Sequence, residues 1–144
     1  MWSKQIETMK NEFRTILYET ERLKIEHEYE ATYLIDKLVN ETLLEDNFYG
    51  DPDCALIDKD NNWAIMAGEH LTFWTYENWK RIENEDLKDI HSIRQKDFYT
   101  VEILIDPWSE KPAIWELNIL SFEYKRIRGF YDYKDEMYKD TVIW

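Results

Sequence analysis

Residues 54–76, CALIDKDNNWAIMAGEHLTFWTY, contain three short apolar runs separated by two turn signals. The side chains of the first turn, residues 58–62, bond locally to the backbone and tolerate left-handed conformations, so they favour a hairpin loop. In the second turn, Gly68 can take the positive φ that a tight hairpin or a bulge needs. This stretch predicts the centre of an antiparallel sheet.

The run 63–67 is apolar on both faces of the predicted strand. Trp63, Ile65 and Ala67 share one face, and Ala64 and Met66 share the other. A strand with two apolar faces is covered on each side or lies centrally in its sheet. We therefore expect further layers against this sheet.

The first fifty residues contain no proline and no glycine before Gly50. Apolar residues recur there at spacings of three and four, which predicts an amphipathic helix capped by Ser3 and packed on the sheet. These residues are Trp2, Ile6, Met9, Phe13, Ile16 and Leu17. Helical spacing resumes over residues 33–45. Residues 21–30 alternate like a strand but lack breakers, so both readings stay open, and we favour one long bent helix or a helix pair.

Downstream of the central stretch, residues 85–95 predict one further short helix. Residues 97–106 and 113–120 predict paired strands around a proline-bounded turn, and a last strand follows before Gly129. The prediction is an α+β fold: an N-terminal helix or helix pair on an antiparallel sheet of about five or six strands. No internal repeat or linker is visible, so residues 1–144 predict a single domain.

Charge indicates the kind of partner. The chain has 31 acidic residues against 18 lysines and arginines, a formal net charge of −13. This balance opposes binding to nucleic acid or to an anionic membrane and favours a basic partner. Cys54 is the only cysteine, and the N-terminus lacks a signal pattern, so we expect a cytoplasmic protein with an inert thiol.

Candidate metal and cofactor sites are weak in this sequence. Asp58, Asp60, Asn62 and Glu69 outline a calcium loop, but Trp63 stands where that loop needs glycine. None of the three histidines has a second histidine or a cysteine three or four residues away, so zinc-ligand spacing is missing. We expect no metal and no cofactor.

Candidate catalytic groups are equally sparse. Glu69 and His70 adjoin a turn but lack a nucleophile or a third group. Glu102 and Glu116 lie in two strands that are expected to pair, which would bring their carboxylates close together, as in a glycosidase active site. Glutamate on the solvated face of a strand is nevertheless ordinary. We expect no catalytic residues.

Aromatic residues point to binding instead. The C-terminal part of the chain is rich in tyrosine, and tyrosine and tryptophan are favoured anchors between proteins. The carboxylates among these tyrosines resemble the polar rim of an interface, although packing at the edge of the core explains the tyrosines equally well. The predicted partner-binding residues are Tyr131, Asp132, Tyr133, Asp135 and Glu136.

The chain combines an acidic character with the hairpin segments ALIDKDNNWAIMAGEHLTFW and VEILIDPWSEKPAIWELNI. In these features it resembles the immunity proteins of bacterial contact-dependent and other polymorphic toxin systems. The resemblance implies a non-catalytic protein that binds and neutralises a cognate toxin domain, often a basic nuclease. Two alternatives remain: a small enzyme using carboxylate or histidine chemistry, and an acidic DNA mimic.

Overall fold

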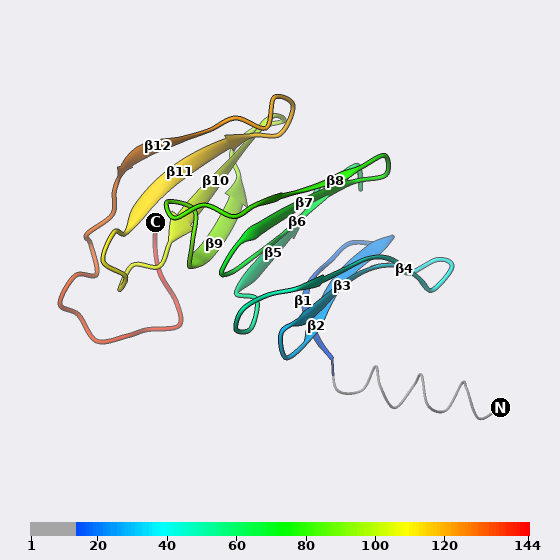
Figure 1. The fold of residues 1–144 in the computed structure, drawn as a ribbon, viewed down its shortest axis with the longest axis horizontal. Coiled ribbons are helices and arrows are strands. Elements are labelled where there is room, and N and C mark those ends of the chain that lie inside the picture. Colours follow the sequence, from blue (N-terminus) through cyan, green and yellow to red (C-terminus); the bar gives the residue numbers. More distant parts are fainter. Residues whose placement is uncertain (1–13) are drawn as a thin grey trace.

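The computed structural model describes residues 14–144, which form twelve β-strands and, within that range, no helix (Figure 1). The strands make three four-stranded antiparallel sheets, each following chain order. The predicted α+β fold is therefore wrong for this part of the chain, which is all-β. The contacts predicted for a helix through Ile6, Met9 and Phe13 lie outside the described residues.

The three sheets divide the strands evenly. The first sheet contains β1 (Thr15–Glu19), β2 (Leu23–Glu28), β3 (Ala31–Asp36) and β4 (Glu41–Asn47). The middle sheet contains β5 (Cys54–Ile57), β6 (Trp63–Ala67), β7 (Leu71–Thr75) and β8 (Trp79–Ile82). The third sheet contains β9 (Ile90–Gln95), β10 (Thr100–Ile105), β11 (Ala113–Asn118) and β12 (Tyr124–Gly129).

The first sheet occupies the region where helices were expected. Leu23 and Ile25 are fully buried on one face of β2, the two-residue period of a strand. The chain reverses at Tyr29, with φ of 53°, and at Asn40, with φ of 52°. These tight turns need neither glycine nor proline. The helix predicted over residues 33–45 is therefore wrong, because this range runs across the β3–β4 hairpin.

The middle sheet confirms the hairpins predicted over residues 54–76. β6 pairs with β5 and with β7, and all five residues of β6 are buried. Gly68 does not take the positive φ that was expected for it. Gly68 is needed for close approach instead, because a Cβ there would lie 3.2 Å from the Cα of Pro52 and 3.3 Å from the amide nitrogen of Asp53.

The third sheet confirms two strands and corrects one helix. β10 pairs with β11, as predicted for residues 97–106 and 113–120, and Glu102 lies directly opposite Glu116. The helix expected over residues 85–95 is wrong. Leu87 is buried in the loop after β8, and Ile90, which is fully buried, begins the strand β9, where Ile93 packs against the same core.

Successive sheets repeat the same meander and lie side by side, with β5 next to both β1 and β9 (Figure 1). The first strands begin 39 and 36 residues apart, at Thr15, Cys54 and Ile90. Four-stranded meanders placed with their first strands together are arranged like consecutive blades of a β-propeller. The repeat is one of architecture, which explains why the sequence itself shows no repeat.

Two apolar layers join the three sheets. Ala64, Met66 and Trp74 of the middle sheet pack with Leu23 and Ile25 of the first. The opposite face of β6 and β7 packs on the third sheet through Trp63, Ile65, Phe73, Ile103 and Ile105, among others. The two apolar faces of residues 63–67 are thus covered by separate sheets, as the sequence predicts.

Candidate partner-binding site

Residues 130–144 cover the face of the third sheet that points away from the middle sheet (Figure 1). Phe130 is fully buried against Leu104 and Ile114, and Val142 and Trp144 pack at the edge of this cluster. The chain leaves β12 and returns along the sheet, and we call it the C-terminal segment. The C-terminal segment carries the predicted partner-binding residues and packs on the hydrogen-bonded third sheet.

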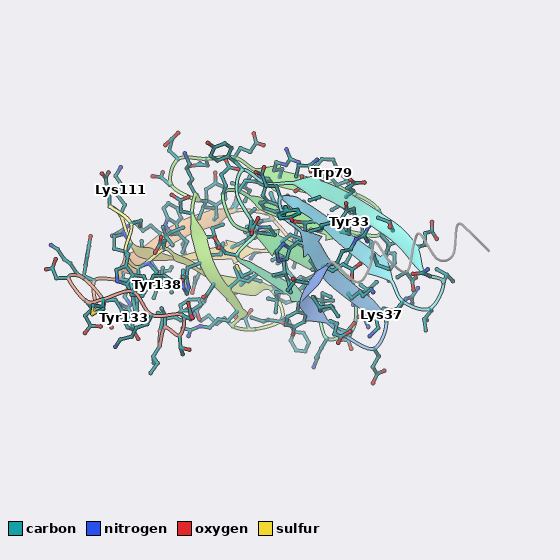
Figure 2. The ribbon with its side chains drawn as sticks, turned by 90° about the horizontal axis from the view of Figure 1, so that it is seen from below. Tyr33, Lys37, Trp79, Lys111, Tyr133 and Tyr138 are labelled. Atoms are coloured by element: carbon teal, nitrogen blue, oxygen red, sulfur yellow. The ribbon has the colours of Figure 1, made fainter. Side chains whose placement is uncertain are left out.

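Trp108, in the β10–β11 loop, holds the middle of the C-terminal segment. Its ring centroid lies 5.6 Å from that of Tyr133 and 4.9 Å from that of Tyr138. Its indole Nε1–H donates a hydrogen bond to the carbonyl oxygen of Glu136 over 3.0 Å. Figure 2 shows Tyr133 and Tyr138 together at one end of the molecule, with Trp79 far from them.

The five predicted residues divide into two groups. Tyr131, Asp132, Asp135 and Glu136 are exposed, Tyr131 to 57%. Tyr133 is half-buried, and its hydroxyl oxygen accepts a hydrogen bond from the backbone N–H of Ile143 over 2.9 Å. Tyr133 therefore supports the segment, whereas the other four residues face solvent.

Further exposed side chains lie on the same segment but are not among the five predicted residues. Met137 is 86% exposed, Tyr138 67% and Ile143 81%. We define the C-terminal surface by its exposed side chains: Tyr131, Asp132, Asp135, Glu136, Met137, Tyr138, Asp140 and Ile143. It combines large apolar contacts with carboxylates, the composition of a protein interface with a polar rim.

Gly129 allows the position of Tyr131. A Cβ on Gly129 would collide with the Tyr131 ring. The absence of a side chain at the end of β12 therefore lets the ring lie close to the backbone as the chain turns into the C-terminal segment. Downstream, the backbone is held by hydrogen bonds from the N–H of Lys134 to the oxygen of Tyr131 and from the N–H of Glu136 to the oxygen of Tyr133.

An acidic hollow of about 380 Å³ adjoins this surface. It is lined by Asp53, Cys54, His91, Ser92, Ile93, Tyr138 and Asp140. These residues come from the start of β5, from β9 and from the C-terminal segment, up to 87 positions apart in the chain. No local sequence pattern joins them, so the sequence could not predict this hollow.

The electrostatics of the hollow disfavour additional negative charge. Burial raises the pKa of Asp53, and the carboxylates of Asp106 and Asp89 add to this rise against the opposing effect of His91. Loss of hydration and the nearby Asp140 raise the pKa of Tyr138. Burial also raises the pKa of the Cys54 thiol, which fits the expected unreactive cysteine.

Arg94 fixes the last described residue of the segment. Its guanidinium lies 3.9 Å from the ring centroid of Trp144 and donates a hydrogen bond to the Trp144 carbonyl oxygen. Arg94 also binds Glu102 through Nε over 2.9 Å. The segment is therefore attached at both ends and in its middle.

A buried polar network connects the first and middle sheets at another place. Asp46 accepts hydrogen bonds from Nε2 of His70 over 2.9 Å, from the hydroxyl of Thr72 and from Arg81. Nδ1 of His70 lies 3.0 Å from Glu69, and its ring stacks on Phe48 at 4.0 Å. Because both ring nitrogens face carboxylates, the environment favours the doubly protonated, positively charged form of His70.

The other candidate catalytic groups do not converge on this network. Glu102 and Glu116 are neutralised by cations, Glu102 by Arg94 and Glu116 by Lys96 over 2.7 Å. His91 lines the acidic hollow, and Nδ1 of His27 lies 3.0 Å from the carbonyl oxygen of Tyr29. The Glu102–Glu116 pair, His91 and His27 thus lie in three places apart from the His70 network, so these groups do not share one pocket.

The acidic turn after β5 has a structural explanation. Asp58 is buried, and its carboxylate accepts a hydrogen bond from the backbone N–H of Asn62 over 3.2 Å. Asn61 takes a left-handed conformation, with φ of 62°. Among residues 14–144, no group of three or more histidine, cysteine or acidic side chains is arranged to hold a metal ion.

No protein-family model matches this chain, and no curated protein is similar to it in sequence. In the part that the structure describes, no helix is long and apolar enough to cross a membrane. The choice of function therefore depends on the geometry and charge of the chain itself.

Proposed function

We propose that this protein is a cytoplasmic, non-catalytic immunity protein that binds and neutralises a cognate basic toxin domain through its C-terminal surface. The observation that supports this proposal is the exposure of Tyr131, Met137 and Tyr138 beside carboxylates on a segment attached to the third sheet. Tyrosine side chains on a preordered backbone supply contact area with little loss of conformational entropy.

Charge supports a basic partner. The net charge of −13 attracts a basic domain over a distance of about 8 Å at physiological ionic strength. On the C-terminal surface, Asp132 and Asp135 form no ion pair with another described residue. Glu136 forms an ion pair with Lys139 over 3.7 Å, but this pair is exposed to solvent and therefore weak. These carboxylates therefore remain free to interact with a partner's cations.

The acidic hollow adds a second contact. A lysine or arginine side chain placed beside Asp53 would offset the loss of hydration and the repulsion from Asp106 and Asp89 that raise the pKa of Asp53. Tyr138 lines this hollow and also belongs to the C-terminal surface. One basic partner could therefore contact both without a change in the chain's structure.

Charge reversal tests the steering role. After co-purification of a partner from the native operon, the variant with Asp132→Lys, Asp135→Lys and Glu136→Lys should associate about tenfold more slowly and show weaker salt dependence. The matched control reverses three exposed glutamates of the first sheet, Glu21, Glu30 and Glu41, with the same change in net charge. Equal slowing by both variants would place the interface elsewhere.

Aromatic truncation tests the anchors. Tyr131→Ala or Tyr138→Ala should speed dissociation by an amount equivalent to about 1–3 kcal/mol, with association little changed. Tyr49→Ala is the control, because Tyr49 is 87% exposed and lies in the β4–β5 loop. If a partner binds and neither tyrosine alters its dissociation by more than about twofold, the C-terminal surface is not the contact.

A further inference from the structure

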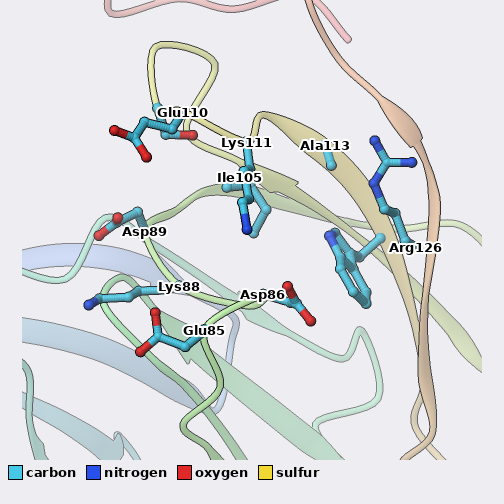
Figure 3. A pocket seen from close by; sticks show the side chains of 11 residues that line it. Glu85, Asp86, Lys88, Asp89, Ile105, Glu110, Lys111, Ala113 and Arg126 are labelled. Atoms are coloured by element: carbon cyan, nitrogen blue, oxygen red, sulfur yellow. The ribbon is translucent and has the colours of Figure 1, made fainter.

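A second cavity, of about 320 Å³, lies between the β8–β9 loop and the face of the third sheet that carries Ala113 and Trp115. One wall is the loop between β8 and β9, which carries the carboxylates of Glu85, Asp86 and Asp89 and also Lys88. The other wall is formed by the β10–β11 loop and β12, which carry Lys111 and Arg126 and also Glu110. Figure 3 shows Asp86 and Lys111 on opposite sides of the space between these walls. The volume is at the lower end of the roughly 300–1,000 Å³ of small-molecule sites.

The floor between the walls is apolar. Ile105 and Ala113 are buried, and Trp115 is half-buried in register with Arg126 across the β11–β12 pair. The indole N–H of Trp115 donates no hydrogen bond to another residue of 14–144. The floor thus offers an aromatic surface together with one free donor on the cationic wall.

The charged side chains around this cavity are unpaired, which is unusual among the described lysines and arginines. Most described lysines and arginines have a carboxylate within 4.0 Å or lie over an aromatic ring. Lys88, Lys111 and Arg126 do neither. Glu85, Asp86, Asp89 and Glu110 also form no ion pair within residues 14–144. Seven charges of both signs therefore surround one space without neutralising one another.

We propose that this cavity binds a small zwitterion with an apolar body, of the size of an aromatic α-amino acid. Lys111, Arg126 and the Trp115 N–H would bind its carboxylate, because guanidinium and ammonium groups form strong charge-assisted hydrogen bonds with carboxylates. Asp86 and its neighbours on the facing loop would bind its ammonium group. Ile105 and Trp115 would contact the apolar body.

The two charged walls define the selectivity. A ligand with only a carboxylate leaves the acidic loop without a partner and places a negative charge near it, whereas a ligand with only an ammonium group leaves Arg126 and Lys111 unpaired. Each loss of a charged hydrogen bond weakens binding by about tenfold. The zwitterion is the one of the three that satisfies both walls.

The test uses L-phenylalanine as the probe and the Trp115 indole N–H signal in two-dimensional NMR as the reporter, assigned with Trp115→Phe. As L-phenylalanine is added up to about 10 mM, the change in the chemical shift of this signal should reach a plateau, because that concentration would nearly fill a site of millimolar affinity. Phenylalaninamide and N-acetylphenylalanine, which lack one charge each, should bind about tenfold more weakly. A non-saturating shift, or equal binding of all three compounds, would overturn the proposal.

Two neighbouring residues of β12 supply a matched pair of variants. Arg126 lies on the Trp115 side of the sheet, and Lys125 lies on the Glu116 side. Arg126→Gln should weaken L-phenylalanine binding about tenfold, and Lys125→Gln should leave it unchanged. Both residues are exposed, so both variants should fold. Equal effects of the two substitutions would show that the probe responds to net charge and would contradict the site.

The acidic wall is tested separately. Asp86→Asn should weaken L-phenylalanine binding but leave the weak binding of N-acetylphenylalanine, which has no ammonium group, unchanged. Lys111→Gln should weaken both compounds because both carry the carboxylate. The proposal fails if Asp86→Asn affects the two compounds equally.

Discussion

His70 shows how one buried side chain can connect two sheets and respond to pH. Burial disfavours its charged form, but the hydrogen bonds to Asp46 and Glu69 outweigh this effect and raise the pKa of His70 above 6.5. Burial alone would also raise the pKa of Asp46, but His70, Thr72 and Arg81 lower it below 3.8. Asp46 belongs to β4 and His70 directly precedes β7, so the pair couples the first sheet to the middle sheet.

The pH dependence of stability follows from these two shifts. The His70 contribution is fully present below pH 6.5 and is lost as pH rises through its folded-state pKa, whereas the Asp46 contribution is present above pH 3.8 and is lost as pH falls through its lowered pKa. We expect His70→Asn to reduce the free energy of unfolding by about 3–5 kcal/mol at pH 5.5, and by less at pH 9. Urea denaturation measures both values.

Glu69→Gln serves as the control for His70→Asn. The Glu69 carboxylate is partly exposed, with 31% of its side chain accessible, so its loss should change the free energy of unfolding by less than about 1 kcal/mol. If the difference between the wild type and His70→Asn is the same at both pH values, His70 is not charged in the folded protein.

Tyr29 stores local backbone strain that substitution can release. Its φ of 53° lies in the left-handed region, which is unfavourable for an aromatic residue and well tolerated by asparagine. The side chain is 80% exposed, so Tyr29→Asn loses little packing. We expect this substitution to increase the free energy of unfolding by roughly 0.5–1 kcal/mol, measured by chemical denaturation. Tyr49→Asn, at an exposed residue with ordinary φ, should give no gain.

At the scale of elements, the C-terminal segment is held by a few specific bonds. Tyr133 packs on Trp108 and accepts the Ile143 N–H, so its role in the fold differs from that of the exposed Tyr131. A loss of partner binding in a Tyr133 variant would therefore reflect displacement of the segment as well as any lost contact. Tyr131 and Tyr138 test the contact more directly.

Tyr133→Phe tests the hydrogen bond between the Tyr133 hydroxyl and the Ile143 N–H separately from the packing of the ring. It removes the acceptor for the Ile143 N–H and keeps the ring, so the local free energy of opening should fall by about 0.5–1.5 kcal/mol. Hydrogen exchange at the Ile143 amide should accelerate accordingly, by a factor of about 2–12, with global stability nearly unchanged. In Tyr131→Phe, whose hydroxyl bonds no other residue of 14–144, that amide should exchange at the wild-type rate.

The elements differ in how well the sequence predicts them. The middle sheet is predictable because its short apolar runs are bounded by residues that favour turns, such as Asp58 and Gly68. The first sheet is not, because Tyr29 and Asn40 form tight turns that no glycine or proline marks, and apolar residues on either side of a hairpin happen to repeat at helical spacing. Local pattern cannot distinguish these cases without the tertiary pairing.

At the scale of the whole molecule, the candidate site was predictable only where it is contiguous. Composition alone selected Tyr131, Asp132, Tyr133, Asp135 and Glu136; all five lie on one segment, where Tyr133 is half-buried and the other four are exposed. The acidic hollow and the second cavity bring together residues from distant strands. Their prediction would require the arrangement of the three sheets, which the sequence pattern did not provide.

The chain-order meander has a consequence for biosynthesis. Every pair of described strands joins strands adjacent in the chain, so the three sheets can form from 33, 29 and 40 consecutive residues with little loop-closure entropy. During translation, the first sheet can pair before the third has been made, and each new sheet then finds an apolar face already in place. The C-terminal segment is synthesised after the third sheet and covers its outer face, so the nascent protein exposes this apolar face to aggregation until the segment has left the ribosome.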